Sequence, residues 1–271
     1  MTSLSRAFAI VDLFTPRRMV WTIDGIAGAL AYSRPTAYRY VRELVSTGLL
    51  SRFGDGGYSL GPRIVELDLL IRGADPLLAA GLPAMREWVG RTGCDVNLIG
   101  LYGDRVVTIH QERGSEMLPL SFGRGRPLPP FRGAGSKVIQ AHRPAAHLRR
   151  AYDRNRSDAE AGGLGSTWLE ARTALRRIRA RGAAVSVGEL DAGFCGLAVP
   201  VRGPRGAVVG CVVAALTQER FALARLDRLT DEVRLVAGRI ESDLRVPAVE
   251  APHLSSARSG VAGAPLMKEA S

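Results

Sequence analysis

The chain has few of the residues from which covalent cross-links and metal sites are built. Its three cysteines, Cys94, Cys195 and Cys211, are odd in number and show no CxxC spacing, which argues against a disulfide framework or a zinc site. Its four histidines show no spacing typical of metal ligands. We therefore expect no metal site, and nothing else in the sequence indicates a cofactor.

Long apolar runs are also absent. A membrane-spanning helix needs about 18 or more consecutive apolar residues, and the sequence contains no such stretch. The opening residues, MTSLSRAFAIVDLF, lack a basic region followed by a longer apolar block, so no secretory signal is predicted. The expected localisation is cytoplasmic, without a membrane partner.

Lysine is scarce, at Lys137 and Lys268 only, whereas arginine gives the 271 residues a formal net charge of +11. Such a charge favours an anionic partner such as nucleic acid. Residues 1–60, however, hold seven arginines and four acidic residues, a net charge of +3. Much of the excess lies in residues 149–181, which we interpret as a solvated helical face in preference to a second DNA site.

Residues 4–15 are predicted to form a first helix. Residues 22–60 carry the most informative pattern, two short helical segments followed by a glycine-rich hairpin. Thr22 is a candidate N-cap of the first helix, and Ser33 is a candidate cap of the second. A turn at Ala31-Tyr32 separates the two helices, and Gly48 ends the second one. This order predicts a winged helix-turn-helix, in which the second helix enters the DNA major groove.

A helix that reads DNA needs cations for phosphates and flexible hydrogen-bond donors for base edges. Arg34, Tyr38 and Arg42 are spaced i, i+4, i+8, so they share a face different from the inward apolar stripe. The candidate DNA-binding residues are Ser33, Arg34, Thr36, Tyr38, Arg39 and Arg42 on the helix, and Arg52 on the wing. The alternative for the helix is that these residues form a solvated face on an ordinary helical module. The alternative for Arg52 is that it is a simple surface charge.

The remaining sequence indicates a linker and a second domain. Residues 61–75 are predicted to form a linker helix, which is stiff enough to transmit a change in domain geometry; the alternative is that it is only a spacer. Residues 76–246 show helices, a hairpin at 95–111, a polar loop at 157–166, three strands and a terminal helix at 221–244. Residues 247–271 lack periodicity and are predicted to be disordered.

Several of these motifs, in this order, make the chain resemble the IclR family of bacterial transcriptional regulators from about Leu4 to Leu244. The first module matches in Thr36-Ala37-Tyr38-Arg39 and Tyr58-Ser59-Leu60-Gly61, and the second in RGAGSK at 132–137 and GFCGLAVPV at 193–201. Two departures stand in the recognition helix, where Pro35-Thr36 replaces a common Ser-Thr pair and Tyr38 replaces a frequent His.

The resemblance implies an α+β protein with three parts. These are an N-terminal winged helix-turn-helix over residues 1–60, a linker helix, and a C-terminal mixed α/β effector-binding domain related to GAF and PAS folds. The implied partners are double-stranded operator DNA, a small-molecule effector, and further copies of the chain in a homodimer or homotetramer.

The family motifs also imply where an effector would bind. One wall would be Phe122, Ala134, Gly135 and Ser136, a second wall Ser186, Phe194 and Gly196, and the floor Val212 and Ala214. Small residues before a helix let backbone N–H groups approach a carboxylate. A floor this apolar disfavours a small hydrated anion, so we expect an organic acid with an apolar or aromatic body. The alternative is that 133–135 is only a tight turn.

Two other functions stay open at this point. A non-specific architectural DNA-binding protein would need more phosphate contacts than the modest charge of residues 1–60 suggests. An enzyme would need a nucleophile beside a base. Cys195 with a histidine is the one conceivable pair, and the spacing of these residues in the sequence does not support it. We therefore expect a regulator and not an enzyme.

Overall fold

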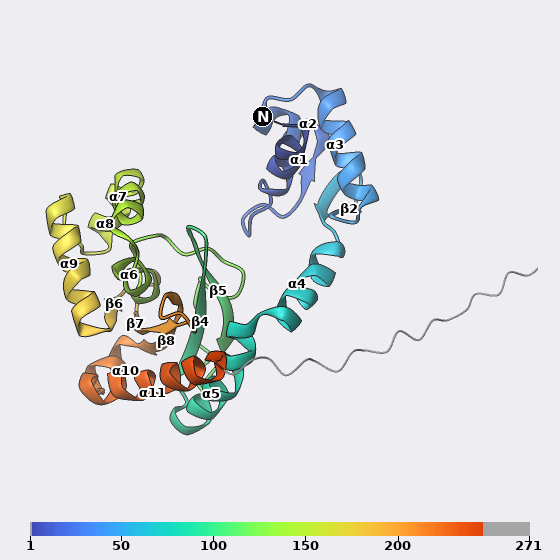
Figure 1. The fold of residues 1–271 in the computed structure, drawn as a ribbon. Helices are drawn as coiled ribbons and strands as arrows, with labels where there is room; N and C mark the ends of the chain where they lie inside the picture. The colour runs from blue at the N-terminus through green and yellow to red at the C-terminus, as the bar shows by residue number, and fades with distance from the viewer. Residues whose placement is uncertain (1, 246–271) are drawn as a thin grey trace, which may run out of the picture.

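The computed structural model describes residues 2–245, and the segment predicted to be disordered, 247–271, lies outside them. The described chain forms an N-terminal helical module and a larger α/β domain, with the helix α4 (Arg63–Ala74) between them (Figure 1). Among these residues, no helix combines the length and the apolar character that crossing a bilayer would require.

The N-terminal module packs three helices against a small antiparallel sheet. The helices are α1 (Ser3–Val11), α2 (Ile23–Leu30) and α3 (Arg34–Ser46), and the strands β1 (Trp21–Thr22), β2 (Leu50–Phe53) and β3 (Gly57–Leu60) lie in the order β1-β3-β2. The core contains Ile10, Trp21, Ile26, Val41 and Leu44, so the apolar stripes of all three helices face inward. The predicted winged helix-turn-helix is confirmed.

Two local details of this module differ from expectation. The first helix, expected at 4–15, ends at Val11, after which the Leu13 carbonyl accepts a hydrogen bond from the Trp21 indole at 3.0 Å. Strand β1, which pairs Trp21 with Tyr58, was not predicted. Two residues are too short to show a period, so only their pairing with β3 reveals the strand.

The second domain is built on a five-stranded antiparallel sheet. Its strands are β4 (Asp95–Tyr102), β5 (Arg105–Glu112), β6 (Ala184–Val187), β7 (Phe194–Arg202) and β8 (Val208–Thr217), in the order β5-β4-β8-β7-β6. The helices are α5 (Pro76–Thr92), α6 (Ala134–Ala141), α7 (Ala145–Arg154), α8 (Arg156–Ala161), α9 (Trp168–Arg181), α10 (Gln218–Leu223) and α11 (Leu226–Arg245).

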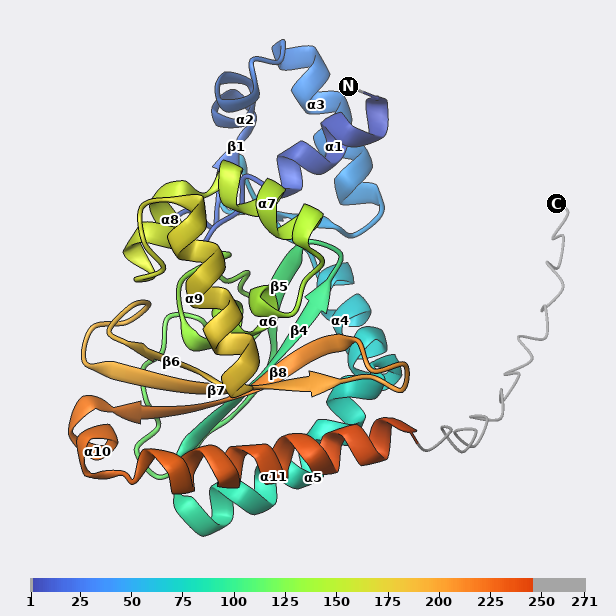
Figure 2. The same ribbon diagram turned by 60° about the vertical axis from the view of Figure 1, so that its left-hand side comes forward.

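Helices cover both faces of this sheet, so the domain has three layers (Figure 2). On one face, α5 and α11 bury a core that includes Trp88, Leu98, Val212 and Ile240. On the other face, α6 lies directly on β7 and β8, and α9 packs on α6. Every residue of α6 is buried. This architecture agrees with the predicted mixed α/β domain.

Two predictions for this domain are wrong in detail. The segment expected to be a polar loop at 157–166 contains α8, whose Asp158 carboxylate accepts the Phe131 N–H at 2.7 Å and pairs with Arg132. The single terminal helix expected at 221–244 is divided into α10 and α11, because Ala224 takes an extended conformation between them. The contacts of α8 join it to residues more than 20 positions earlier in the chain, which periodicity does not reveal.

Candidate functional site

The turn between α2 and α3 sets the angle between these two helices. Thr22 caps α2, its hydroxyl accepting the Gly25 N–H at 3.1 Å, which confirms the expected cap. Ala31 then adopts a left-handed conformation with φ of 52°, which is uncommon for a residue with a Cβ. Ser33 stands at the N-cap of α3, but its hydroxyl lies 2.8 Å from the Thr36 hydroxyl and caps no backbone N–H.

The candidate DNA-binding side chains lie on the surface of α3, away from the core. Tyr38 is 51% exposed, and Arg34, Arg39 and Arg42 are also exposed. Arg34 pairs with Asp24 on α2 at 3.1 Å, and Arg42 pairs with its neighbour Glu43 at 3.3 Å. These pairs are fully at the surface, so each contributes little to stability and a phosphate can displace it.

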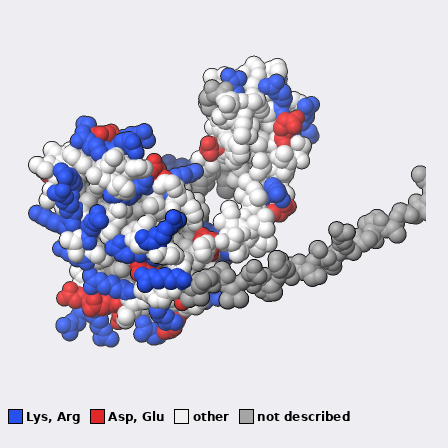
Figure 3. All heavy atoms as spheres, in the orientation of Figure 1, with Lys and Arg blue, Asp and Glu red and all other residues white. Residues whose placement is uncertain are grey.

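The other two candidate arginines on the module, Arg39 and Arg52, differ in their contacts with the rest of the module. The Arg39 guanidinium stacks over the buried Tyr40 ring at 5.0 Å, so its head group is held against the module. Arg52 is exposed on the wing formed by β2 and β3. Figure 3 shows basic side chains along the α3 side of the module, with a few acidic ones among them. Contact of these residues with DNA stays a prediction.

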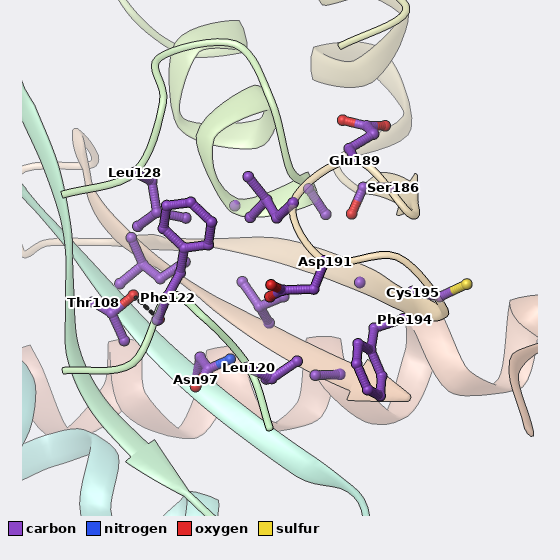
Figure 4. Close-up of a pocket in the computed structure, with 17 residues that line it drawn as sticks. Asn97, Thr108, Leu120, Phe122, Leu128, Ser186, Glu189, Asp191, Phe194 and Cys195 are labelled. Atoms are coloured by element: carbon purple, nitrogen blue, oxygen red, sulfur yellow. Dashed lines mark hydrogen bonds between the residues drawn. The ribbon is translucent and has the colours of Figure 1, made fainter. Parts of the chain in front are cut away.

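The second domain contains a cavity between the sheet, helix α6 and the loops at 118–133 and 188–193; we call it the sheet cavity (Figure 4). It encloses about 530 Å³, counting the part that opens to solvent. Its lining consists of Asn97, Ile99, Thr108, Leu120, Phe122, Leu128, Ala134, Gly135, Ser186, Glu189, Leu190, Asp191, Phe194, Cys195, Gly196, Val213 and Ala215.

Six of the nine residues expected to bind an effector line this cavity, and three do not. Phe122, Ala134, Gly135, Ser186, Phe194 and Gly196 are brought together as predicted. Ser136 is fully buried and does not line the cavity.

The structure corrects the prediction that Val212 and Ala214 form the floor of the cavity. These two residues belong to the core beneath α5 and α11, on the opposite face of the sheet.

The strand register explains this correction. Val213 pairs with Asn97 on one side and with Ala198 on the other, and Ala215 pairs with Gly196. Side chains alternate between the faces of a strand, so a shift of one residue exchanges floor for core. Val213 and Ala215 are therefore the floor, and they are as small and apolar as the residues first assigned.

Two glycines at the start of α6 let this end of the helix pack closely on its neighbours beside the cavity. Gly133 has a φ of 82°, which disfavours side chains, and Leu190 lies 2.6 Å from where its Cβ would be. A Cβ on Gly135 would lie 2.4 Å from Ile99 Cδ1. Gly135 thus favours close packing of α6 on the sheet, and Gly133 favours close packing of its N-terminus on Leu190. Ala134 and Gly135 line the cavity, and their N–H groups, in the first turn of α6, have no intrahelical acceptor.

A buried ion pair fixes the loop that forms the outer wall. Lys137 Nζ, almost fully buried, lies 2.5 Å from Glu189 Oε1, and Glu189 Oε2 accepts the Gly133 N–H at 2.9 Å. Asp191 accepts the Ser121 N–H at 3.0 Å and so joins the same wall to the loop carrying Phe122. Both acids therefore already have partners, one of them a full positive charge.

Sequence reasoning missed the polar residues that the sheet itself contributes. Asn97 on β4 is buried, and its Oδ1 has no hydrogen-bond partner among the described residues. Thr108 on β5 donates its hydroxyl to the Phe122 carbonyl at 3.0 Å. Asn97 and Thr108 each interrupt a run of apolar residues within their strands, and such an interruption is a signal by which the sequence could have indicated them.

The cysteines are placed unfavourably for catalysis. Cys195 lines the cavity but is buried, and burial raises the pKa of its thiol, whereas a nucleophile needs a lowered one. Burial also raises the pKa of the Cys211 thiol far above its ordinary value. Within residues 2–245, no cluster of three or more His, Cys, Asp or Glu side chains could hold a metal ion.

The loop that carries Phe122 also contacts the helix between the two domains. Arg124 donates to the Ile109 carbonyl and pairs with Asp68 of α4 at 2.5 Å. Close by, the Tyr102 hydroxyl donates to Asp75 at 2.7 Å; burial and this carboxylate raise the pKa of Tyr102 to about 12. One wall of the sheet cavity is thus joined by a short chain of contacts to α4.

Comparison with known proteins agrees with this architecture in both domains. Residues 3–52 match the model of the IclR helix-turn-helix domain, and residues 74–242 match that of the bacterial transcriptional regulator IclR C-terminal domain. Among curated proteins, the Pca regulon regulatory protein of Pseudomonas putida is 23% identical over 252 residues, 88% of this chain and 82% of that protein.

Solved structures show the same fold. A regulator from Silicibacter sp. TM1040 superposes with a TM-score of 0.75 at 21% identity, covering 90% of this chain and 96% of the other. An IclR homologue from Microbacterium hydrocarbonoxydans, crystallised as a complex, gives 0.74 at 24% identity, with 91% and 100% covered. With both domain models matched in order along its length, the chain belongs to the IclR family of bacterial transcriptional regulators.

Proposed function

We propose that this regulator binds a specific double-stranded operator through α3 and the wing, and that a small organic acid in the sheet cavity changes its operator affinity. The observation that supports the proposal most strongly is the sheet cavity, which lies in a different domain from the exposed basic face of α3. A ligand there changes DNA affinity only if it binds one domain arrangement better than another.

The chemistry of the cavity favours a monocarboxylic acid with an aromatic body. The first turn of α6 offers N–H groups and the positive end of the helix dipole to one carboxylate. Leu120, Phe122 and Leu128 supply an apolar surface for a ring. Asp191 carries its own negative charge at the wall, which disfavours a second carboxylate on the ligand.

Asn97 favours a ligand that also carries a hydrogen-bond donor. Its unpartnered carbonyl oxygen, buried in the cavity lining, suits a hydroxyl or amine donor on the ligand. The relative from Microbacterium hydrocarbonoxydans was crystallised with 4-hydroxybenzoate, a molecule that combines a carboxylate, a ring and a hydroxyl group. That ligand has the features we propose for the effector of this chain.

Thermal unfolding with single ligands tests the effector class. We expect 4-hydroxybenzoate to raise the Tm, benzoate to raise it less, and pyruvate and glyoxylate to leave it unchanged. In the Asn97→Leu variant, 4-hydroxybenzoate should lose about 1 kcal/mol of binding free energy, or about fivefold in affinity, while benzoate is unaffected. Stabilisation by pyruvate and glyoxylate alone would exclude an aromatic acid.

Binding to DNA needs its own test. Mapping of bound sites across the genome should yield one sequence motif, and a duplex with that motif should survive competition by random duplex. Equal binding to all sequences would instead indicate an architectural protein, because phosphate contacts alone carry no sequence information.

Linker helix α4 supports the proposal that the protein assembles with further copies of itself. None of its residues is buried, and Val65, Leu69 and Leu70 are 72%, 70% and 63% exposed. An apolar patch of this kind marks an interface. Leu69→Glu should lower the assembly state in sedimentation velocity, whereas Leu235→Glu, at a residue 68% exposed on α11, should leave it unchanged. A Leu69 variant that sediments like the unmodified chain would contradict this interface.

A further inference from the structure

A second cavity lies at the other end of α6, enclosed by α7 and the turn between β4 and β5. It encloses about 480 Å³ including its open part, and it shares no lining residue with the sheet cavity. Its lining is Asp104, Pro130, Gln140, Arg143, His147, Arg150, Ala151, Arg154 and Asn155. We call it the arginine cavity, because three arginines and one acid give it a positive charge.

The single acid of this cavity is already neutralised. Asp104 lies 2.5 Å from Arg143 and 3.8 Å from His147, and the Arg143 guanidinium holds the pKa of Asp104 below its ordinary value. Arg143 also donates to the Gly103 carbonyl at 2.9 Å, so its side chain is fixed at the base of the cavity. It is a positioned cation with its charge balanced.

Arg150 and Arg154 have no such balance. They stand four residues apart on one face of α7, and neither forms an ion pair with any residue between 2 and 245. The nearest acid along the helix, Asp153, pairs with Arg149 at 2.8 Å and with Arg156 at 3.4 Å. Figure 3 shows basic side chains gathered over α7 and α9, with a few acidic ones among them.

Gln140 provides an independent observation that the cavity is built to bind. Its side chain is 2% exposed, lines the cavity, and has no partner for Oε1 in the described chain. Leaving a buried amide unpaired costs about 1–3 kcal/mol, and a ligand that bonds to it removes this cost. The two ends of an amide are assigned from their partners, so an unpaired amide can present either its N–H or its C=O.

We propose that the arginine cavity binds the oxyanion group of a small metabolite, a phosphate or a carboxylate, separately from the effector. Guanidinium groups match the geometry of both oxyanions. Arg150 and Arg154 bind the oxygens of the ligand, and the Gln140 amide, turned to present its N–H, donates to one of them. The ends of α6 then line two different sites, about 9 Å apart from Ala134 to Gln140 along the helix axis.

Titration calorimetry on the full chain tests this site, with inorganic phosphate and acetate as probes at constant ionic strength. The test variant is Arg150→Ala with Arg154→Ala. The matched control is Arg172→Ala with Arg176→Ala, which removes the same charge from exposed positions four residues apart on α9, outside both cavities.

We expect saturable binding of one anion per chain, weakened on the order of tenfold in the test variant and unchanged in the control. Tighter phosphate would assign a phosphorylated ligand, and tighter acetate a carboxylate. Equal weakening in both variants would overturn the proposal, because it would reduce the effect to general charge. Absence of saturable binding of either probe by the unmodified chain would also overturn it. Should the double variant fail to fold, the single variant Arg154→Ala gives the same comparison.

Discussion

Replacing Asp68 with Asn removes the charge on α4 that Arg124 contacts, and so tests how the sheet cavity communicates with the linker. Arg124 lies two residues after Phe122 in the loop that forms one cavity wall. A ligand that moves this loop changes the distance between the Arg124 and Asp68 charges, which the structure holds at 2.5 Å. The Asp68→Asn variant should therefore respond less to the effector at its operator.

The size of the effect follows from the exposure of the pair. The Arg124 and Asp68 side chains are 27% and 46% exposed, so solvent screens much of their attraction. Pairs of this kind contribute about 0.5–1 kcal/mol, which corresponds to about a two- to fivefold change in an equilibrium constant. That factor is the expected reduction in the ratio of operator Kd with and without effector.

The measurement is a thermodynamic cycle. Operator Kd is measured by fluorescence anisotropy with and without 4-hydroxybenzoate, in the unmodified chain, Asp68→Asn, Arg124→Met and the double variant. Linkage requires operator DNA to change effector affinity by the same factor, which provides an internal check. The matched control is Glu66→Gln, which breaks a pair at 2.6 Å with Arg63 inside α4 alone.

A clear result would refute the reasoning. If Asp68→Asn shifts operator Kd equally with and without ligand, the Arg124–Asp68 pair stabilises the linker but does not couple effector binding to operator affinity. The same conclusion holds if Glu66→Gln reduces the effector response as much as Asp68→Asn does, because any loss of charge on α4 would then suffice.

Three further predictions follow from the structure. Arg39→Ala or Arg42→Ala should weaken operator binding by about 1–3 kcal/mol, whereas Arg52→Ala should weaken binding to all sequences and reduce the salt slope by about 1. If the variant that combines Arg39→Ala with Arg42→Ala binds the operator unchanged, α3 is not the recognition helix. Ala31→Gly should raise the free energy of unfolding by about 0.5–1 kcal/mol in urea titrations, because the left-handed conformation costs Ala about 1–2 kcal/mol and Gly loses part of that gain as chain entropy; a lower stability would contradict this reading of the turn. Burial, and to a lesser degree the Arg202 and Arg179 charges, lower the pKa of His142 from its ordinary 6.5, so its contribution to stability is present above about pH 6.5 and lost as the pH falls through the lowered pKa; His142→Gln should flatten that part of the pH profile of Tm, and an unchanged profile would exclude this residue as its source.

Local sequence determined the DNA-binding module almost completely. Thr22, the turn at 31–32, Gly48 and the apolar stripe of α3 act within a few residues of each other, so capping and periodicity suffice to place α2 and α3. The linker helix was predicted on the same basis, and α4 lies within the expected 61–75. Where local signals were too short, as in β1, prediction failed.

The tertiary structure alone decided which residues meet in the cavities. Strand β8 is apolar on both faces, so nothing in its sequence distinguishes Val212 from Val213, and only its pairing with β4 and β7 places Val213 at the floor. The same holds for Asn97 in the lining of the sheet cavity and for Asp68 beside Arg124, which is 56 residues away in the chain. Side chains whose roles depend on partners so distant in sequence leave no periodic signal, because their positions are set by strand register and packing and not by local propensity.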